Sequence, residues 1–417
     1  MSASEVVVVA GRRTPFAKAG TALSHLTARQ LAAHAVAALL EAVRFPPGQV
    51  EALCCGTVVL DPRTPNMARE VVFDTPLPAS VPAHTVSNYC ISGLRALTDI
   101  AGLIAAGRIT AGIAAGADSL SNPPVLFRPA AARLFTRLAG SRSTAARLRL
   151  LGRLRPRHFL PDTGGAREPS TGLTMGEHCE IMAKTWSVSR EAQDEIALMS
   201  HQRATQAWDD GRLAAEVAPI AGLARDTLPR RDTSPAKLAA LRPVFDRTPA
   251  GTITAGNSSP LTDGGSAVLL MSRGGARKAG YTPLAILRDW EYAAISPADG
   301  LLMAPAVAVP RLLARHRLTL DELDLVEVHE AFGAQVRANL MAWERGWKAP
   351  VIGRVDPLRL NVCGSSIAVG HPFAATGGRI TTTLAYEMSR RTARRGLVSI
   401  CAAGAMAGAL LLEGSGE

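Results

Sequence analysis

Residues 6–116 alternate short apolar runs with longer amphipathic segments. Strands are predicted over 6–16, 52–59, 84–89 and 110–116, and helices over 28–43 and 91–106. The helical pattern is clearest in 91–106, where apolar residues recur every three or four positions. These are Ile91, Leu94, Leu97, Ile100 and Ile104. Strands that alternate with helices predict an α/β fold with a mostly parallel sheet under a cover of helices.

The alternation stops at residue 123 and resumes near residue 283. Strand-like residues 252–271 close the interruption. The later pattern predicts strands over 284–289 and 325–328, helices over 306–315 and 331–343, and a closing strand pair over 397–401 and 409–412. We therefore predict two similar halves, 1–122 with 251–282 and 283–417, with 123–250 inserted into the first. A cysteine at a strand end in each half, Cys90 and Cys401, hints at an internal duplication.

The composition is that of a globular protein packed with small side chains. Of 417 residues, 47% are hydrophobic, 19% charged and only 4% aromatic, which excludes a disordered chain. The apolar run from Val6 to Ala10 is too short for a signal peptide, and no stretch reaches the roughly 18 apolar residues of a spanning helix. We expect a cytoplasmic protein, with contact at the inner membrane surface as a further expectation.

The six cysteines form no CxxC pair and no zinc-ligand spacing. In a chain without an export signal we expect them to be reduced thiols, with no metal site. Four of them read as small buried hydrophobic residues. They are Cys54, Cys55, Cys179 and Cys363.

The net charge of +11 is concentrated in one segment, because residues 123–161 hold nine arginines and no acidic residue. Arginine alternates with Leu and Phe from Arg128 to Arg157, which predicts an amphipathic helix pair. A charged lid packed on the body, a docking surface for a partner subunit or anionic lipid, and a contact with CoA phosphates all fit this pattern. Nucleic acid is not expected as a partner, since no recognition motif accompanies the charge.

Three stretches of small residues carry the candidate chemistry: NYCISG around Cys90, AVGHPFAATGG around His371, and CAAGAMAG from Cys401. Small neighbours let backbone N–H groups approach an oxyanion. One thiol at the start of a helix can hold an acyl group, an imidazole can activate it, and the second thiol can move a proton. This layout suits carbon–carbon bond chemistry on a thioester.

A fourth candidate is His329, which with Glu330 lies in EVHEAFGAQ at a predicted strand-to-helix turn. No second histidine follows His329 at the spacing of a zinc motif. A polar side chain at such a turn can hold a water molecule or an oxyanion.

Together these segments resemble the thiolase family over nearly the whole chain. The matching segments, in order, are RTPFAKAG, NYCISG, GADSLS, TMGEH, TAGNSSPLTDGG, HEAFGAQ, GHPFAATGGR and CAAG. Two features resemble the β subunit of fatty-acid-oxidation trifunctional complexes. They are the motif HEAF, in place of the commoner NEAF, and the long basic insertion. The resemblance implies a thiolase fold of five αβαβα layers, built from two βαβαβαββ halves with an inserted loop domain.

The resemblance also implies an acyltransferase that cleaves 3-ketoacyl-CoA with CoA as co-substrate, in fatty acid β-oxidation, without a permanently bound cofactor. Cys90 would attack the 3-keto carbon, His371 would take its proton, and Cys401 would exchange protons with acetyl-CoA and CoA. His371 and a water held by His329 would form one oxyanion hole, and the N–H groups of Cys90 and Ala403 the other. Met175, Ser259 and Phe332 match positions at the pantetheine channel.

Some residues depart from the family pattern. Ala374, Ala405 and Ala407 stand where glycines are expected, as does Ser365. An alanine forced to positive φ is strained by roughly 1 kcal/mol. Two alternatives therefore stay open: a biosynthetic thiolase that forms acetoacetyl-CoA, and a weakened subunit that binds acyl-CoA or scaffolds a complex. The resemblance implies a homodimer or tetramer, and docking on a hydratase/dehydrogenase α subunit.

Overall fold

The apolar runs of the sequence become strands of one mixed sheet in a computed structural model that describes residues 4–162 and 167–416. The strands of the body are β1 (Val6–Arg13), β2 (Ala17–Lys18), β3 (Leu53–Gly56), β4 (Ala83–Val86), β5 (Ala111–Ser119), β8 (Thr262–Ser272), β9 (Ala285–Ala294), β10 (Leu325–Val328), β11 (Arg395–Ala402) and β12 (Met406–Glu413). Their order is β10-β11-β12-β9-β1-β8-β5-β3-β4, with β2 beside β8. The predicted elements are thus present, and most ends are shifted by a few residues. The exception is the segment expected over 252–271, where the strand begins only at Thr262.

The expectation of a mostly parallel sheet is wrong. Only β3–β4, β3–β5 and β10–β11 pair in parallel within the described part of the chain, and the other pairs are antiparallel. The reason is that each half ends with a strand that turns back. β12 follows β11 after a tight turn, and β8 returns from the insertion to lie against β5.

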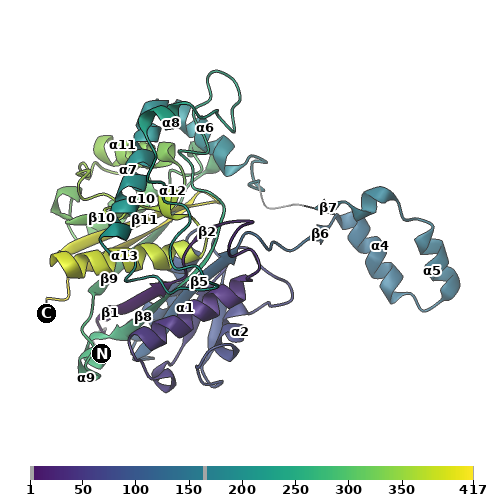
Figure 1. Cartoon of the computed structure of the whole chain (residues 1–417), viewed down its shortest axis with the longest axis horizontal. Helices are drawn as coiled ribbons and strands as arrows, with labels where there is room; N and C mark the ends of the chain where they lie inside the picture. Colours follow the sequence, from purple (N-terminus) through teal and green to yellow (C-terminus); the bar gives the residue numbers. More distant parts are fainter. Residues whose placement is uncertain (1–3, 163–166, 417) are drawn as a thin grey trace.

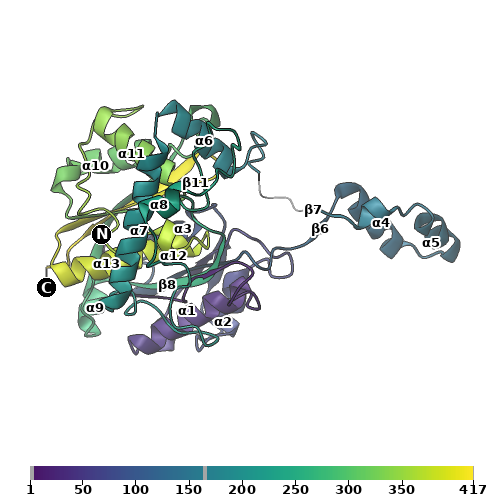
Figure 2. The ribbon, with the colours of Figure 1, turned by 45° about the horizontal axis from the view of Figure 1, so that its top comes forward.

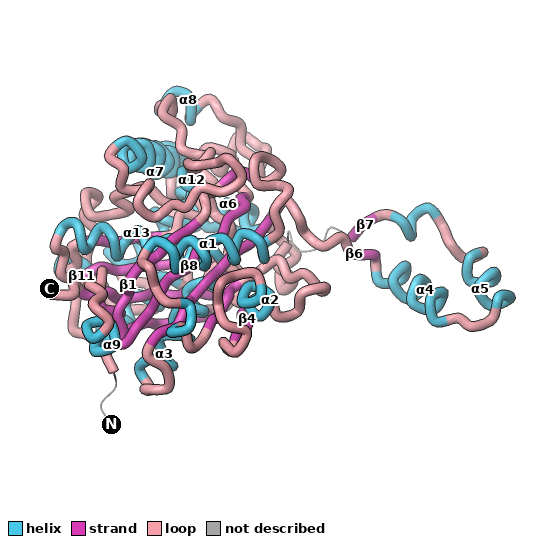
Figure 3. The backbone as a smooth tube through the Cα atoms, turned by 60° about the horizontal axis from the view of Figure 1, so that its bottom comes forward, coloured by secondary structure: helices cyan, strands magenta, loops and turns pink. Residues whose placement is uncertain are grey.

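Two half-sheets and three layers of helices alternate in the expected order αβαβα (Figures 1 and 3). β1 and β9 pair at only three positions, so the two half-sheets meet at one corner and diverge. The buried helices α3 (Ser92–Ala105) and α13 (Ala375–Arg391) fill the space between them. α1 (Ala28–Ala42) and α2 (Met67–Phe73) cover the outer face of the first half-sheet. α10 (Pro305–Arg315) and α11 (Gly333–Arg345) cover the outer side of the second.

The two halves repeat one topology. Each half contains, in order, a central strand, an outer helix, a parallel strand, a buried helix and an antiparallel strand pair. In this repeat α3 corresponds to α13, and β5 corresponds to β11. The duplication is therefore present, but Cys90 and Cys401 are not equivalent in it. Cys90 precedes α3, whereas Cys401 lies near the end of β11. The counterpart of Cys90 is the loop before α13, which carries His371.

Glycine allows the two central helices to touch backbone to backbone. A Cβ at Gly93 in α3 would lie 2.1 Å from the carbonyl oxygen of Ala374, and one at Gly377 in α13 would lie 2.2 Å from the amide nitrogen of Leu94. Any larger residue would push the helices apart. The close approach brings the starts of α3 and α13 together, and with them the loops that carry Cys90 and His371.

The insertion divides into a part packed on the body and a part that projects from it. α6 (Met175–Thr185) and α7 (Arg190–Asp209) pack against α11, and α8 (Pro235–Ala239) packs against α7. Figure 2 shows these helices over the second half of the chain. The short helix α12 (Ser366–Val369) also lies against α7, and α9 (Arg273–Lys278) follows β8.

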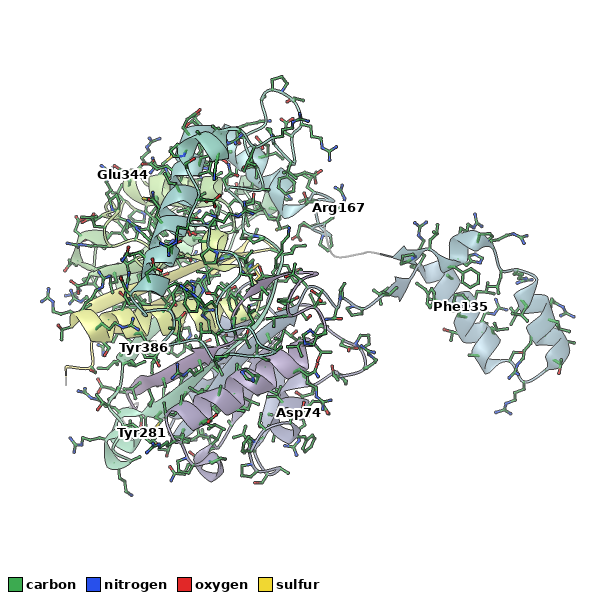
Figure 4. All side chains as sticks on the ribbon, in the orientation of Figure 1. Asp74, Phe135, Arg167, Tyr281, Glu344 and Tyr386 are labelled. Atoms are coloured by element: carbon green, nitrogen blue, oxygen red, sulfur yellow. The ribbon has the colours of Figure 1, made fainter. Side chains whose placement is uncertain are left out.

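The arginine-rich stretch forms the predicted helix pair, α4 (Pro129–Gly140) and α5 (Thr144–Leu151). Strands β6 (Leu126–Phe127) and β7 (Pro161–Asp162) pair at its base, where the ring of Phe135 contacts those of Phe127 and Phe159. We call residues 125–162 the arm. It extends away from the body (Figures 1 and 4), so the alternative of a lid packed on the body does not hold.

The remaining short elements are the 3₁₀ turns at Pro47–Gln49, Pro156–Phe159, Pro297–Asp299 and Leu320–Glu322. Within residues 4–162 and 167–416, no helix is long and apolar enough to cross a membrane.

Candidate active site

Cys90 sits in a tight turn between β4 and α3. Tyr89, just before it, has a left-handed backbone with φ of 49°. The Ser92 hydroxyl stabilises this turn, since Oγ accepts from the amide of Asn88 at 2.7 Å and donates to the carbonyl of Tyr89 at 2.6 Å. The turn points the Cys90 side chain into the space between the half-sheets, where it packs with the central core.

His371 lies in the loop between α12 and α13, in contact with that thiol. Its Nε2 is 3.2 Å from Cys90 Sγ, and its Nδ1 is 2.7 Å from Thr376 Oγ1. The His371 amide donates to Thr262 Oγ1 at 3.1 Å. Gly370, with φ of 110° and Thr262 against the place of a Cβ, allows the sharp turn that delivers the ring. The structure thus pairs two residues that are far apart in the sequence.

The imidazole ring of His329 lies against that of His371, tilted by 45°. His329 follows β10, is fully buried, and its ring centroid lies 4.1 Å from that of His371. Its Nδ1 is 2.8 Å from Ser366 Oγ. Glu330 turns away from the histidines, because its carboxylate accepts from Ser200 at 2.6 Å and from Asn361 at 2.7 Å. His329 therefore faces the site, while Glu330 anchors the loop.

Cys401, near the end of β11, and Ala403, in the β11–β12 turn, lie close to Cys90. Cys401 is 1% exposed, and burial raises its pKa, which the neighbouring Cys90 raises further. The backbone N–H groups of Ala403 and of Cys90 itself favour the thiolate of Cys90 and oppose the effect of burial on its pKa.

Burial nevertheless keeps the site neutral in the free protein. Loss of solvation raises the pKa of Cys90 to about 12, which outweighs the two backbone N–H groups. Burial, with the nearby charge of Arg379, lowers the pKa of His371 to about 3. A thiol and an imidazole in contact suit proton transfer at the moment of attack rather than a standing ion pair.

The positions where other residues replace the expected family glycines differ in their backbone φ angles. Ala374 has φ of −67°, and Ala407 lies in β12, so neither needs a glycine. Ser365 is also outside the left-handed region, with φ of −139°. Ala405 alone of these has positive φ, at 55°. The predicted strain is therefore confined to one residue of the β11–β12 turn.

A cavity of about 510 Å³ opens beside the site. Its wall includes Ser259 and Phe245, and also Leu261, which forms a backbone bridge to His371. Phe332 supports this wall with its ring edge-on to Phe245, at 6.1 Å between centroids. The start of α6 also abuts Phe245, since a Cβ at Gly176 would meet that ring.

The residues expected at a pantetheine channel thus lie on one side of the site. Ser259 lines the cavity and Phe332 backs it, while the half-buried Met175 begins α6 next to Gly176. The mouth of the cavity is basic, with Lys18, Arg230 and Lys237 against a single acid, Asp232. A long ligand with an anionic end would match this polarity.

One group outside the site could hold a metal ion. The ligand atoms of Cys54, His84 and Asp99 lie within 4.8 Å of one another, on the side of the sheet that faces α3. However, Arg95 Nε already donates to Asp99 at 2.8 Å, so a guanidinium cation occupies the carboxylate. This cluster shares no residue with the catalytic candidates.

Sequence reasoning missed the residues that hold the histidines. Thr376 and Ser366 each contact one imidazole, and Arg379 donates to Ser366 at 2.8 Å. The sequence feature that could have identified Arg379 is its position as the single charged residue of the small-residue run AATGGR. Nothing local marked the two hydroxyls, because their importance arises only when α12 and α13 meet β10.

The geometry agrees with comparisons to known proteins. A family model for the thiolase N-terminal domain matches residues 6–274, and one for the thiolase C-terminal domain matches residues 281–414. The chain belongs to the thiolase family of acyltransferases. It is 42% identical to the 3-ketoacyl-CoA thiolases of Escherichia fergusonii and Escherichia coli over 98% of this chain and 96% of each relative.

Solved structures give the same picture. The acetyl-CoA acetyltransferase of Bacillus anthracis superposes with a TM-score of 0.86 at 29% identity, covering 99% of both chains. A thiolase from Ascaris suum in complex with coenzyme A gives a TM-score of 0.84 at 27% identity, covering 98% of this chain and 100% of that one. The thiolase fold predicted from the sequence is confirmed.

Proposed function

We propose that this protein cleaves 3-ketoacyl-CoA with CoA, giving acetyl-CoA and a shortened acyl-CoA, through an acyl group held on Cys90. The single observation that carries the proposal is the 3.2 Å contact between Cys90 Sγ and His371 Nε2. The curated relatives named 3-ketoacyl-CoA thiolase support the choice of substrate.

In the first half-reaction, Cys90 Sγ attacks the 3-keto carbon and its proton passes to His371 Nε2. Thr376 accepts from Nδ1–H of the resulting imidazolium. The bond between C2 and C3 then breaks, and its electron pair leaves as the enolate of acetyl-CoA. Cys401 protonates that carbon and becomes a thiolate, while the acyl group stays on Cys90 as a thioester.

In the second half-reaction, the Cys401 thiolate takes the proton of the CoA thiol, and the CoA sulfur attacks the thioester carbon. Cys90 leaves, and the His371 imidazolium returns its proton to it, so each residue ends as it began. The N–H groups of Cys90 and Ala403 stabilise the oxyanion on the carbon bound to Cys90. His371 and a water held by His329 stabilise the thioester oxygen of the enolate.

The cavity of about 510 Å³ supports a place for CoA. We propose that pantetheine runs past Met175, Ser259 and Phe332 toward Cys90. The phosphates would lie at the basic mouth, near Arg230 and Lys237. No bound metal or cofactor is needed for these steps, because each proton has a donor and an acceptor among the named side chains and CoA.

Replacing Cys90 with Ala tests this function directly. The variant should lose at least about 10³-fold of CoA-dependent cleavage, because no acyl-enzyme can form. Cleavage is followed by the loss of the enolate absorbance of a 3-ketoacyl-CoA. Cys363→Ala, a buried cysteine outside the site, is the matched control and should retain activity. Full activity of Cys90→Ala would refute the mechanism.

The biosynthetic and the scaffold alternatives gain less support. The curated relatives are named 3-ketoacyl-CoA thiolase, and Ala374 and Ala407 cause no backbone strain at the site. We propose a role in fatty acid β-oxidation, in a cytoplasmic setting, as a homodimer or tetramer. We also keep the division into 1–122 with 251–282, 123–250 and 283–417 as a proposal.

We further propose that the arm docks on a hydratase/dehydrogenase α subunit or on an anionic membrane surface. Its outer end exposes Leu148 and Leu151 between arginines. No arginine from 128 to 157 forms an ion pair with the described residues. Exposed apolar and unpaired basic groups side by side are typical of a surface that binds an acidic, partly apolar partner.

A further inference from the structure

A chain of three buried side chains leads from α13 to the ring of His329. Arg379 donates from Nη2 to Ser366 Oγ at 2.8 Å, and the same Oγ is 2.8 Å from His329 Nδ1. Arg379 is 1% exposed, and the other two side chains are fully buried. All the hydrogen-bonding groups are therefore shielded from water.

The direction of each hydrogen bond in this chain follows from its first member. A guanidinium has donors and no acceptor, so Ser366 Oγ must accept from Arg379. Ser366 Oγ has no further hydrogen-bond partner among the described residues, so its single hydroxyl proton has only His329 Nδ1 as an acceptor. Burial lowers the pKa of Arg379, and the nearby acidic groups Glu327, Glu216 and Glu330 oppose that shift. A guanidinium keeps its charge in proteins.

His329 itself is neutral. Burial and the neighbouring His371 and Arg379 hold its pKa well below the usual value. A neutral imidazole carries one proton. With Nδ1 accepting from Ser366, that proton is on Nε2. This nitrogen is buried and has no partner among the described residues, and its ring lies against that of His371.

We propose that Arg379 and Ser366 are positioning residues that lock His329 in the Nε2–H form, a fixed donor to the oxygen that gains charge or to the water that bridges to it. The inference rests on the proposed function, since it assigns a task within that reaction. A fixed donor needs no reorganisation when charge develops, which is the condition for stabilising an oxyanion.

His371 provides the contrast. Its Nδ1 faces Thr376 Oγ1, and within the described residues that hydroxyl bonds to no other side chain. A hydroxyl can donate or accept, so Thr376 allows His371 to gain and lose a proton at Nε2. His371 can therefore change its protonation state, whereas the tautomer of His329 is fixed.

The first test reads the tautomer without any turnover. In protein labelled with ¹⁵N-histidine, the His329 signals are assigned by their loss in His329→Asn. We expect a protonated Nε2 and an unprotonated Nδ1 in the wild type, and averaged signals in Ser366→Ala. A protonated Nδ1 in the wild type overturns the proposal. Because no substrate is present, this result is independent of whether the protein is a thiolase.

The second test is a double-mutant cycle on cleavage. Ser366→Ala should lower kcat about 10-fold and leave KM within about twofold, because it frees the tautomer without deleting the donor. In a His329→Asn background the same change should have no further effect, since an amide N–H has no tautomer. An equal loss in both backgrounds overturns the proposal in favour of a packing role.

Two variants control the cycle. Ser365→Ala removes the other hydroxyl that Arg379 donates to, at 3.2 Å, but not the contact with His329. It should leave the His329 signals unchanged. Ser366→Thr keeps the hydroxyl and should restore the single Nε2–H form. Averaged His329 signals in Ser365→Ala, or in a folded Ser366→Thr, would contradict the proposal.

Discussion

At the residue scale, the chemistry of Cys90 depends on a balance between burial and hydrogen bonds. The N–H groups of Cys90 and Ala403 favour the thiolate, but burial favours the thiol more strongly and raises its pKa to about 12. The low pKa of His371 has the same cause. In the proposed mechanism the proton of Cys90 therefore passes to His371 Nε2 during the attack rather than before it.

This balance predicts how Cys90 reacts with iodoacetamide in the free protein. The thiolate fraction of a group titrating near pH 12 rises about tenfold per pH unit from about pH 6 to about pH 9, and the alkylation rate should follow it. Peptide mass spectrometry of carboxymethylated Cys90 measures the rate. In the denatured chain the same curve should bend near pH 8.5. A rate for folded protein that is flat with pH would instead indicate a standing ion pair with His371.

Ala405 gives a second prediction at this scale. With φ of 55° it carries strain that glycine does not, so Ala405→Gly should raise the free energy of unfolding by about 1 kcal/mol. Ala374→Gly is the matched control. At φ of −67° it should lower the same quantity by about 0.5 kcal/mol, through loss of chain stiffness. Chemical denaturation measures both, and a lowered stability of Ala405→Gly would contradict the assignment of strain.

At the element scale, the sequence predicted the strands and helices better than the way they pair. Ile91, Leu94 and Leu97 marked α3 through their spacing, since helix periodicity is a local property. The antiparallel return of β8 was not predicted, because its partner β5 lies far away in the sequence, across the insertion. Cys90, His371 and Cys401 could be found from their small neighbours, whereas Ser366 and Arg379 gain their meaning only from contacts between elements.

The contact of α3 with α13 predicts a sharp difference between two glycines. Gly377→Ala should lower the free energy of unfolding by about 3 kcal/mol, with loss of activity, because its Cβ would strike the backbone at Leu94. Gly102→Ala, in α3 with open space around it, should raise stability by up to about 1 kcal/mol. Thermal unfolding and cleavage assays distinguish them. Equal tolerance of both changes would show that the helices do not meet so closely.

At the scale of the whole molecule, the arm and the body, which is the rest of the described chain, have separate roles. The body holds the large buried cores and every candidate catalytic residue. The arm has little core of its own beyond Ala131 and the aromatic contacts at its base. Its separation from the body predicts that changes at its outer end leave cleavage intact.

Charge reversal at Arg147, Arg149 and Arg153 tests this division. The triple change to Glu should retain full activity while abolishing binding to anionic vesicles or to a co-expressed α subunit, because these exposed cations supply the attraction. Vesicle sedimentation and co-purification distinguish the two partners. A matched triple reversal on the body, at Arg277, Lys278 and Arg288, should change neither. Unaltered binding by the arm variant in both assays would disprove docking through this surface.

The seam between the two halves has a consequence for synthesis of the protein. In the proposed mechanism the nucleophile, Cys90, belongs to the first half, and the base, His371, and the second thiol, Cys401, belong to the second. A nascent chain that stops before residue 371 therefore lacks the base for that nucleophile, and one that stops before residue 401 lacks the second thiol. Turnover therefore begins only after the β11–β12 hairpin has formed. The activity measured in a cell extract then comes only from completely synthesised chains.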